Sequence, residues 1–340
     1  MKRTARMLLV NGLALLALGV GGLRAEEPAV KTKSPPEKNV RLVWFPRFSP
    51  NGKWLLSAHG SWDANEGGEV RMWEAATGTA KHVLKQPRGI RSVAWCPDGT
   101  YFVIGGYGGD LRFYDTASGK MLHEANQGTN IEGVCISSDK SRLVVTLGSG
   151  SVRVLELPSR KEIHLFKSAH QGGIWGMALS PNGKLLATAG KDNYVRIFDL
   201  TTLKKVHELK HPGETNGVTF TPDNKRLLSG CTDALIRVFD VESGQQTGEL
   251  KGHEQGSVTD LQFTSDGKLL ASSGNDGTVR LWNTADLDKP SLQKTLREHD
   301  NLVFGVAFSP DDALLASVDW NDKVLVWDLA KGAERWAWKR

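Results

Sequence analysis

Cysteine is scarce in this sequence. Only three occur in 340 residues, Cys96, Cys135 and Cys231, and they are far apart and odd in number. This usage argues against a disulfide framework, so we expect packing to hold the fold together. No histidine or other base lies near Cys96 in the sequence, and nothing there indicates an activated thiol.

Catalytic signatures are also missing. The sequence contains no nucleophile elbow, no Walker loop, no HExxH and no CxxC pattern. The GGYGG run at 105–109 is rich in glycine, but it lies between two predicted strands and opens no helix whose N-terminus could hold a phosphate. We therefore expect no catalytic residue, no cofactor-binding residue and no cofactor.

A basic surplus is absent once the first 25 residues are set aside. The whole chain has 43 basic and 38 acidic residues and a formal charge of +5. Lys2, Arg3, Arg6 and Arg24 fall in residues 1–25 with no acid, which leaves 39 basic against 38 acidic residues. A nearly neutral remainder does not predict a nucleic-acid partner.

Residues 1–25, MKRTARMLLVNGLALLALGVGGLRA, have the order of a secretory signal peptide: a basic start, an uncharged run from Met7 to Leu23, and a small residue at Ala25. We expect cleavage and an exported protein, periplasmic or secreted, with no other membrane association. A retained anchor is the alternative, because a run of 17 residues is at the short limit for spanning a bilayer. Residues 26–38, EEPAVKTKSPPEK, predict a flexible proline-rich linker.

From residue 39 onward, one phrase occurs in seven related copies. FTSDGKLLASSGNDGTVRLW at 263–282 returns as LSPNGKLLATAGKDNYVRIF at 179–198 and as FSPDDALLASVDWNDKVLVW at 308–327. The copies begin 41 to 47 residues apart, at Phe48, Trp95, Ile136, Leu179, Phe220, Phe263 and Phe308. A fixed period of this size indicates stacked copies of one supersecondary unit.

Each copy has the pattern of four short strands joined by tight turns, such as NLVFGVAF, LLASV, VRLW and KVHELK. Leu, Val and Ile occupy both faces of these strands, so each sheet needs a neighbour on either side, and a closed ring provides it. We predict an all-β fold, a seven-bladed β-propeller of four-stranded antiparallel blades, over residues 39–340. The predicted blades are about 39–86, 87–127, 128–169, 170–210, 211–251, 252–297 and 298–340.

The dipeptides that close the copies resemble the WD-repeat signature, and the chain is identified as a member of the WD-repeat β-propeller family, of an exported bacterial type. These dipeptides are Trp73-Glu74, Tyr114-Asp115, Phe198-Asp199, Phe239-Asp240, Trp282-Asn283 and Trp327-Asp328. The resemblance implies a hydrogen-bonded structural tetrad, complete at His253, Ser272, Asp276 and Trp282. Blades 4 and 5 have similar sets without the indole: His170, Thr188, Asp192 and His211, Ser229, Asp233. Blades 1 to 3 lack the histidine, and we expect them to rely on apolar packing alone.

Ring closure departs from the common pattern of the family, in which an N-terminal strand completes the last blade. The C-terminal AKGAERWAWKR resembles the outer strand of the earlier copies, whereas residues 26–38 are too rich in proline to pair well. We predict that blade 7 takes its outer strand from its own C-terminus, around Trp336 and Trp338. Side-chain packing between blades 7 and 1 would then close the ring.

Metal binding is not expected. The run DANEGGEVRMWE matches a calcium-loop spacing at Asp63, Asn65 and Glu74, but a glycine stands at position 67 where a ligand is needed, and no helices flank the loop. Calcium at these three residues is the alternative. Four histidines recur in the predicted outer strands, and we interpret them as half-exposed rim residues: His82, His123, His164 and His207.

The propeller places one residue of each inner strand at one mouth of the central channel: Trp44, Arg91, Glu132, Trp175, Asn216, Thr259 and Phe304. Neighbouring turns add Trp62, Tyr107 and Trp320 on the same side. Interface energy concentrates in aromatic and arginine residues, and the family commonly binds partners at this face. We predict partner binding at Trp44, Trp62, Arg91, Tyr107, Glu132, Trp175, Phe304 and Trp320. Alternatively, Trp44, Trp175 and Phe304 plug the channel or pack between blades.

We therefore predict a non-catalytic scaffold that binds a protein or peptide, as a monomer or as a subunit of a complex. The alternative is a propeller-framed enzyme or cofactor-associated protein, similar to lactonases or quinoproteins. Such sites need carboxylates, histidines or basic residues converging on the channel. Glu132 and Arg91 are the only charged residues that the pattern places at its mouth.

Overall fold

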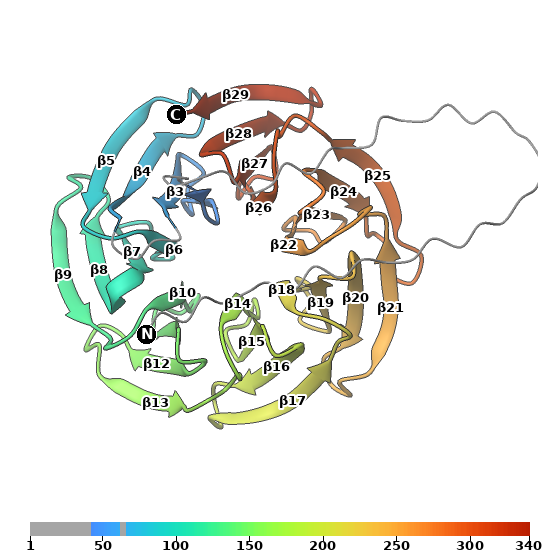
Figure 1. The fold of residues 1–340 in the computed structure, drawn as a ribbon, viewed down its shortest axis with the longest axis horizontal. Helices are drawn as coiled ribbons and strands as arrows, with labels where there is room; N and C mark the ends of the chain where they lie inside the picture. Colours follow the sequence, from blue (N-terminus) through green and yellow to red (C-terminus); the bar gives the residue numbers. More distant parts are fainter. Residues whose placement is uncertain (1–41, 62–65) are drawn as a thin grey trace, which may run out of the picture. The chain divides into compact units, whose positions relative to one another are not determined.

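The computed structural model describes residues 42–61 and 66–340. The predicted signal peptide, the linker and the first residues of blade 1 lie outside the described residues, as do Trp62, Asp63 and Asn65. The described residues form a seven-bladed β-propeller of antiparallel blades, with a single short 3₁₀ turn, η1 (Tyr107–Gly109), as their only helical segment (Figure 1). The predicted fold class is therefore confirmed. No helix in the described part of the chain has the length and apolarity to cross a membrane.

Blades 1 to 4 use the first seventeen strands. Blade 1 contains β1 (Leu42–Val43), β2 (Arg47–Phe48), β3 (Trp54–Gly60), β4 (Gly68–Glu74) and β5 (Ala80–Gln86). Blade 2 contains β6 (Ile90–Trp95), β7 (Tyr101–Gly106), β8 (Asp110–Asp115) and β9 (Met121–Asn126). Blade 3 contains β10 (Ile131–Ile136), β11 (Arg142–Leu147), β12 (Val152–Glu156) and β13 (Glu162–Phe166). Blade 4 contains β14 (Ile174–Leu179), β15 (Leu185–Gly190), β16 (Tyr194–Asp199) and β17 (Lys204–Lys210).

Blades 5 to 7 complete the ring. Blade 5 contains β18 (Thr215–Phe220), β19 (Arg226–Cys231), β20 (Leu235–Asp240) and β21 (Gln246–Lys251). Blade 6 contains β22 (Val258–Phe263), β23 (Leu269–Gly274), β24 (Val279–Asn283) and β25 (Ser291–Leu296). Blade 7 contains β26 (Val303–Phe308), β27 (Leu314–Asp319), β28 (Lys323–Asp328) and β29 (Ala333–Lys339).

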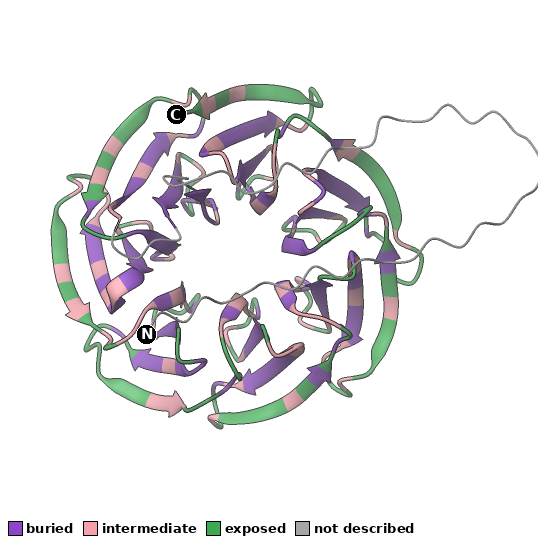
Figure 2. Cartoon of the chain, in the orientation of Figure 1, coloured by how far each residue is buried: buried purple, intermediate pink, exposed green. Residues whose placement is uncertain are grey.

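The core lies between blades rather than inside them. One cluster of buried side chains joins Val43, Leu55 and Trp73 of blade 1 to Val318 and Val324 of blade 7, and the other clusters link neighbouring blades in the same way. Outer strands such as β9 and β17 are largely exposed, whereas inner strands are largely buried (Figure 2). Leu, Val and Ile on both strand faces therefore serve the purpose that the sequence predicts, since each blade covers its neighbour.

The inner strands approach one another closely. Their third residue is glycine in β10, β14, β18 and β26, at Gly133, Gly176, Gly217 and Gly305. A Cβ atom on Gly176 would lie 1.8 Å from the carbonyl oxygen of Asn216 on the next blade, so only glycine fits there. Strand β22 departs from this rule with Asp260, whose carboxylate accepts a hydrogen bond from the Val306 amide of β26 at 3.2 Å.

Blade 7 is completed by β29, which pairs antiparallel with β28 and carries Trp336 and Trp338. The predicted origin of this strand is confirmed, and no described strand is shared between blades 7 and 1. The indole of Trp336 donates a hydrogen bond to the carbonyl of Ala75 at 2.9 Å, and Trp338 lies 5.2 Å from Trp73 between ring centroids. Side chains therefore close the ring.

A buried polar network also crosses this joint. His59 of β3 contacts Ser57 at 2.7 Å through Nε2 and Asp322 of blade 7 at 2.5 Å through Nδ1, and the Trp73 indole donates to Ser57 Oγ at 2.7 Å. Arg340 pairs with Asp322 at 2.9 Å. The expectation that blade 1 relies on apolar packing alone is wrong, because a strand histidine takes the place of the missing loop histidine.

Blades 2 and 3 also have polar ties in place of the histidine. Gln86 donates to the Tyr114 hydroxyl at 3.0 Å and accepts from Arg112 at 2.9 Å. Arg153 donates to Gln127 at 2.8 Å in the same setting of blade 3. The expectation of purely apolar packing is therefore wrong for these blades as well, since the buried Tyr114 and the partly buried Arg112 and Arg153 need hydrogen-bond partners, which glutamine supplies.

The tetrad of blade 6 is fully hydrogen-bonded. His253 contacts Ser272 at 2.8 Å and Asp276 at 2.9 Å, and the Trp282 indole donates to Ser272 at 2.8 Å. Burial opposes ionisation of Asp276, but the hydrogen bond and charge of His253 outweigh it and hold the pKa of this carboxyl below its usual range.

Blade 7 has a second complete tetrad that the sequence analysis does not predict. His299 contacts Ser317 at 2.6 Å and Asp319 at 2.9 Å, and the Trp327 indole donates to Ser317 at 3.0 Å. The aspartate stands two residues after the serine, whereas Asp276 stands four residues after Ser272. The different spacing is the reason that it escapes a search by pattern.

Blades 4 and 5 differ from each other. In blade 4, His170 contacts Thr188 at 2.8 Å and Asp192 at 2.9 Å. In blade 5, His211 contacts Ser229 at 2.8 Å, but its Nδ1 meets the carbonyl oxygen of Leu209, while Asp233 pairs with Arg237. The predicted association of His211 with Asp233 is therefore wrong. Burial without a carboxylate partner lowers the pKa of His211 to about 4.

Candidate functional site

The channel mouth lies where the inner strands begin. Six of the seven predicted mouth residues line one hollow of about 190 Å³. They are Trp44, Arg91, Trp175, Asn216, Thr259 and Phe304. Glu132 lines a deeper cavity instead.

Arg91 contacts several of the other residues around this hollow. Its guanidinium pairs with Glu132 at 2.8 Å and lies 4.3 Å from the ring centroid of Trp44 and 5.4 Å from that of Trp175. A guanidinium between two indoles combines cation–π attraction with a neutralising carboxylate. Residues from blades 1, 2, 3 and 4 are joined here into one rigid group.

An aromatic row continues toward blade 7. Phe304 lies 5.0 Å from Trp44 and 5.4 Å from Trp320 between ring centroids. On the other side, the hydroxyl of Tyr107 accepts a hydrogen bond from Arg91 at 3.4 Å. Of the predicted partner-binding residues, only Trp62 lies outside the described part of the chain.

Burial divides these residues into two layers. The exposed fractions of Trp44, Arg91 and Tyr107 are 3%, 3% and 8%, so these side chains form the floor of the mouth. Trp175, Phe304 and Trp320 are half-buried and reach the surface. Glu132 is also half-buried, but it lines the cavity below the mouth. The three half-buried aromatic residues are therefore the ones that can contact a partner at the mouth, and the buried floor supports them.

The opposite wall of the hollow is polar and was not predicted. It is formed by Glu214, Thr232, Ser257 and Asn275 of blades 5 and 6. Asn216 donates to Ser257 at 2.6 Å, and the buried Oδ1 of Asn275 has no hydrogen-bond partner among the described residues. These residues lie in polar turns, where the sequence pattern gives no sign of which side chains turn inward.

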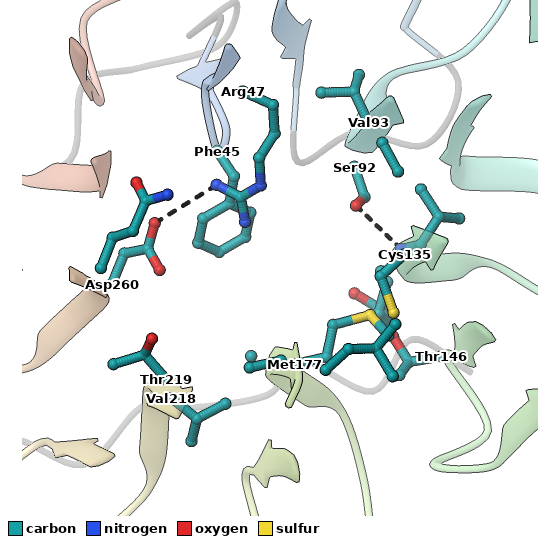
Figure 3. A pocket seen from close by; sticks show the side chains of 18 of the residues that line it. Phe45, Arg47, Ser92, Val93, Cys135, Thr146, Met177, Val218, Thr219 and Asp260 are labelled. Carbon is teal, nitrogen blue, oxygen red and sulfur yellow. Dashed lines mark hydrogen bonds and ion pairs between the residues drawn. The ribbon is translucent and has the colours of Figure 1, made fainter. Parts of the chain in front are cut away.

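A cavity of about 360 Å³ occupies the channel below the mouth (Figure 3). Arg47 and Asp260 lie next to each other in its lining, with the guanidinium nitrogen Nη1 and Oδ2 separated by 3.8 Å. Burial raises the pKa of Asp260 to about 6. The only sequence signal for this cavity is the aspartate in the place of the inner-strand glycine.

The alternative calcium site cannot be assembled from the described residues, because Asp63 and Asn65 lie outside them. The third candidate ligand, Glu74, accepts a hydrogen bond from the Thr77 hydroxyl at 2.7 Å. Within residues 42–61 and 66–340, no group of three or more His, Cys, Asp or Glu side chains is placed to hold a metal ion.

The outer-strand histidines are half-buried at the rim, as predicted. His82 of blade 1 packs on Gly119 of blade 2, and His207 of blade 4 packs on Gly244 of blade 5. Trp336 of blade 7 packs on Gly78 of blade 1 in the same manner. The rim contact is thus a repeated link between blades, and the joint between blades 7 and 1 has it too.

Comparison with known proteins gives two family matches. The family model described as IFT122 first beta-propeller matches residues 130–334, more than half of the chain, and the model described as WD domain, G-beta repeat matches residues 78–115. The WD repeat and SOCS box-containing protein 1 of Xenopus tropicalis is 43% identical over 75 residues, 22% of this chain and 17% of that protein. The target of rapamycin complex subunit wat1 of Schizosaccharomyces pombe is 27% identical over 157 residues, 46% of this chain and 36% of that protein. The matched segments span less than half the length of these relatives.

Proposed function

This chain belongs to the WD-repeat β-propeller family, and we propose that it is a non-catalytic scaffold that binds a protein or peptide partner at the mouth of its central channel. WD-repeat relatives suggest an interaction scaffold at the level of the family. One of them is named as a subunit of the target of rapamycin complex, which supports a role within an assembly.

The observation that carries the proposal is the two-layered mouth. Trp175, Phe304 and Trp320 reach the surface above a buried floor in which Arg91 is fixed by Trp44 and by its ion pair. Aromatic side chains that are already held in place lose little rotamer freedom when a partner arrives. A rigid aromatic surface beside a hollow matches the residue types that dominate interface energies.

The polar wall specifies the chemistry of the partner further. Glu214 of blade 5 and Asn275 of blade 6 offer acceptor oxygens in the part of the hollow between Trp175 of blade 4 and Phe304 of blade 7. A peptide segment can place an apolar side chain against the aromatic row and donate hydrogen bonds from its backbone amides to the polar wall. We propose that such a segment is the part of the partner that enters the mouth.

We also propose that binding takes place after export. This proposal is supported by the signal-peptide pattern of residues 1–25. The partner would then be a periplasmic or secreted protein. Fractionation of the producing cells, followed by N-terminal sequencing of the mature chain, tests this, and a chain that stays in the cytosol with residues 1–25 intact would contradict it.

Site-specific photo-crosslinking tests the face. A photoreactive amino acid at Thr232, which is exposed and lines the hollow, should form an adduct with the partner. The matched control is Lys225, an exposed residue of the same blade in the turn at the opposite end of strand β19. Adducts from Lys225 and none from Thr232 would place the partner on the other face.

Alanine substitutions test the anchors with the partner identified in this way. Trp175→Ala and Phe304→Ala should each weaken binding at least tenfold, the usual effect of losing an aromatic hot spot. Trp54→Ala is the control, since Trp54 is also half-buried but lies at the far end of β3 from the mouth. Equal loss of affinity in all three variants would indicate a general loss of stability and refute a specific role of the mouth.

A further inference from the structure

We propose that the central channel contains a second site, which binds a small monocarboxylate with an apolar body through the guanidinium of Arg47. The cavity of about 360 Å³ lies below the mouth and is lined by residues from every blade (Figure 3). One water molecule occupies about 30 Å³ in the liquid. The cavity therefore has room for an organic molecule rather than for a lone ion.

Arg47 retains donors for a ligand. Its Nη1 donates to the carbonyl of Pro46 at 2.8 Å, and its guanidinium lies 5.6 Å from the ring centroid of Phe45. Among the described residues, the sole acidic neighbour is Asp260, at 3.8 Å, which is longer than a hydrogen bond. The side chain of Arg47 is 37% exposed although it lines the channel. A guanidinium has five N–H donors in a planar fork that matches the two oxygens of a carboxylate.

The inner strand of blade 1 explains why an arginine stands here. This strand is interrupted between β1 and β2, where Pro46 lacks the amide that a continuous ladder needs. The break turns Phe45 and Arg47 into the channel, as Figure 3 shows. Arg47 and Gln262 also line a second hollow of about 260 Å³ beside Phe308 and Ser309, so the two hollows adjoin at these side chains.

Asp260 selects a singly charged ligand. Its oxygens accept hydrogen bonds from the Val306 and Leu261 amides at 3.2 and 3.0 Å, so backbone donors satisfy it without the arginine. Beside a protonated Asp260, the single positive charge of Arg47 balances one negative charge on the ligand, whereas a dianion would keep a second charge uncompensated in the cavity. A cationic ligand would instead be repelled by Arg47.

Part of the remaining wall is apolar, although Ser92, Thr146 and Thr219 also line the cavity. Met177, Val218 and Val134 line the cavity, together with the thiol of Cys135. Burial raises the pKa of Cys135 to about 12, so the thiol is neutral near pH 7. A ligand that is charged at one end and apolar at the other fits the division between Arg47 and these side chains.

Binding should take up a proton. Burial raises the pKa of Asp260 to about 6, and an anion bound beside it raises this pKa further. Arg47 is the charged side chain that faces Asp260, while Glu132 is paired with Arg91 and Cys135 is neutral in this pH range. Affinity should therefore rise about tenfold between pH 7 and pH 5, as the free site becomes protonated.

Calorimetric titration of the purified chain with benzoate tests the proposal. Benzoate should bind one to one, more tightly at pH 5 than at pH 7. Benzylamine has the same shape with the opposite charge and should not bind. Arg47→Gln should abolish binding, and Arg47→Lys should weaken it at least fivefold, because lysine keeps the charge without the fork. Asp260→Asn should bind with no pH dependence beyond that of benzoate itself.

Arg226→Gln is the matched control, because Arg226 is also a half-buried arginine but donates to Thr247 on blade 5, away from the cavity. It should bind benzoate as the wild type does. The Arg47→Lys variant keeps the length of the side chain and guards against a result due to unfolding. Absence of saturable benzoate binding, unchanged binding by Arg47→Gln, or preference for benzylamine would each overturn the proposal.

Discussion

Replacing His59 with alanine tests whether the joint between blades 1 and 7 is held by the buried contact between His59 and Asp322. The side chain of His59 is fully buried, and that of Asp322 is 6% exposed. Removing one partner of a buried pair costs about 3–5 kcal/mol. Because Arg340 remains 2.9 Å from Asp322 and still compensates its charge, we expect a value near the lower end, about 3 kcal/mol.

His253→Ala is the matched control. His253 has the same kind of serine and aspartate partners, is equally buried, and leaves Asp276 beside Arg280 at 3.3 Å, but all of these residues belong to blade 6. We expect similar losses in the free energy of unfolding for the two variants, measured in urea. The difference lies in where the structure loosens.

Hydrogen exchange locates the effect. His59→Ala should speed amide exchange in β3 of blade 1 and also in β27, β28 and β29 of blade 7, because the lost contact joins the two blades. His253→Ala should speed exchange within blade 6. If His59→Ala leaves exchange in blade 7 unchanged, or lowers the free energy of unfolding by less than about 1 kcal/mol, the contact between His59 and Asp322 does not hold the joint.

Three further predictions concern stability. Burial lowers the pKa of His211 to about 4, so the unfolded chain binds a proton first and the wild type loses stability as pH falls from about 6.5 toward 4. The advantage of wild type over His211→Ala in urea should therefore shrink by about 2 kcal/mol between pH 7 and pH 5, and a constant difference would contradict this. Ser317→Ala should cost about 1–3 kcal/mol in the same assay, since the Trp327 indole loses its acceptor, and a neutral result would argue against the tetrad of blade 7. Trp336→Ala should lower the free energy of unfolding by about 2 kcal/mol, and Trp336→Phe by about half of that. Phenylalanine keeps the packing and loses only the hydrogen bond to Ala75, so equal losses in the two variants would assign the whole effect to that bond.

The fold follows from the sequence because each blade carries its own local signals. Apolar alternation and turn residues recur within every copy, so an error in one copy does not change the architecture. The C-terminal origin of β29 was predictable for the same reason, since AKGAERWAWKR repeats the outer-strand pattern. Most of the mouth was predictable too, because the position after the first apolar residue of each inner strand is fixed by the period of two.

The contacts that were missed join residues far apart in the chain. Asp322 lies 263 positions from His59, and no local pattern connects them. The tetrad of blade 7 had one usable signal: Ser317 precedes Trp327 by 10 positions, as Ser272 precedes Trp282. The channel pair had another, the aspartate at 260 in place of glycine, but its meaning depends on Arg47, which faces it only because the inner strand of blade 1 is interrupted.

Among the described residues, blades 7 and 1 share no strand, and this affects how the protein is made. Every described blade consists of contiguous sequence, so during synthesis each new blade can settle on the one before it as soon as its strands leave the ribosome. Blade 1 differs, because the face that packs on blade 7 has no neighbour until synthesis ends. Its face with Val43, Leu55 and Trp73 stays in contact with water until the final blade emerges. The nascent chain therefore exposes an apolar, aggregation-prone surface for almost the whole of its translation. Chaperones that bind such surfaces can bind this one for longer than any other in the ring.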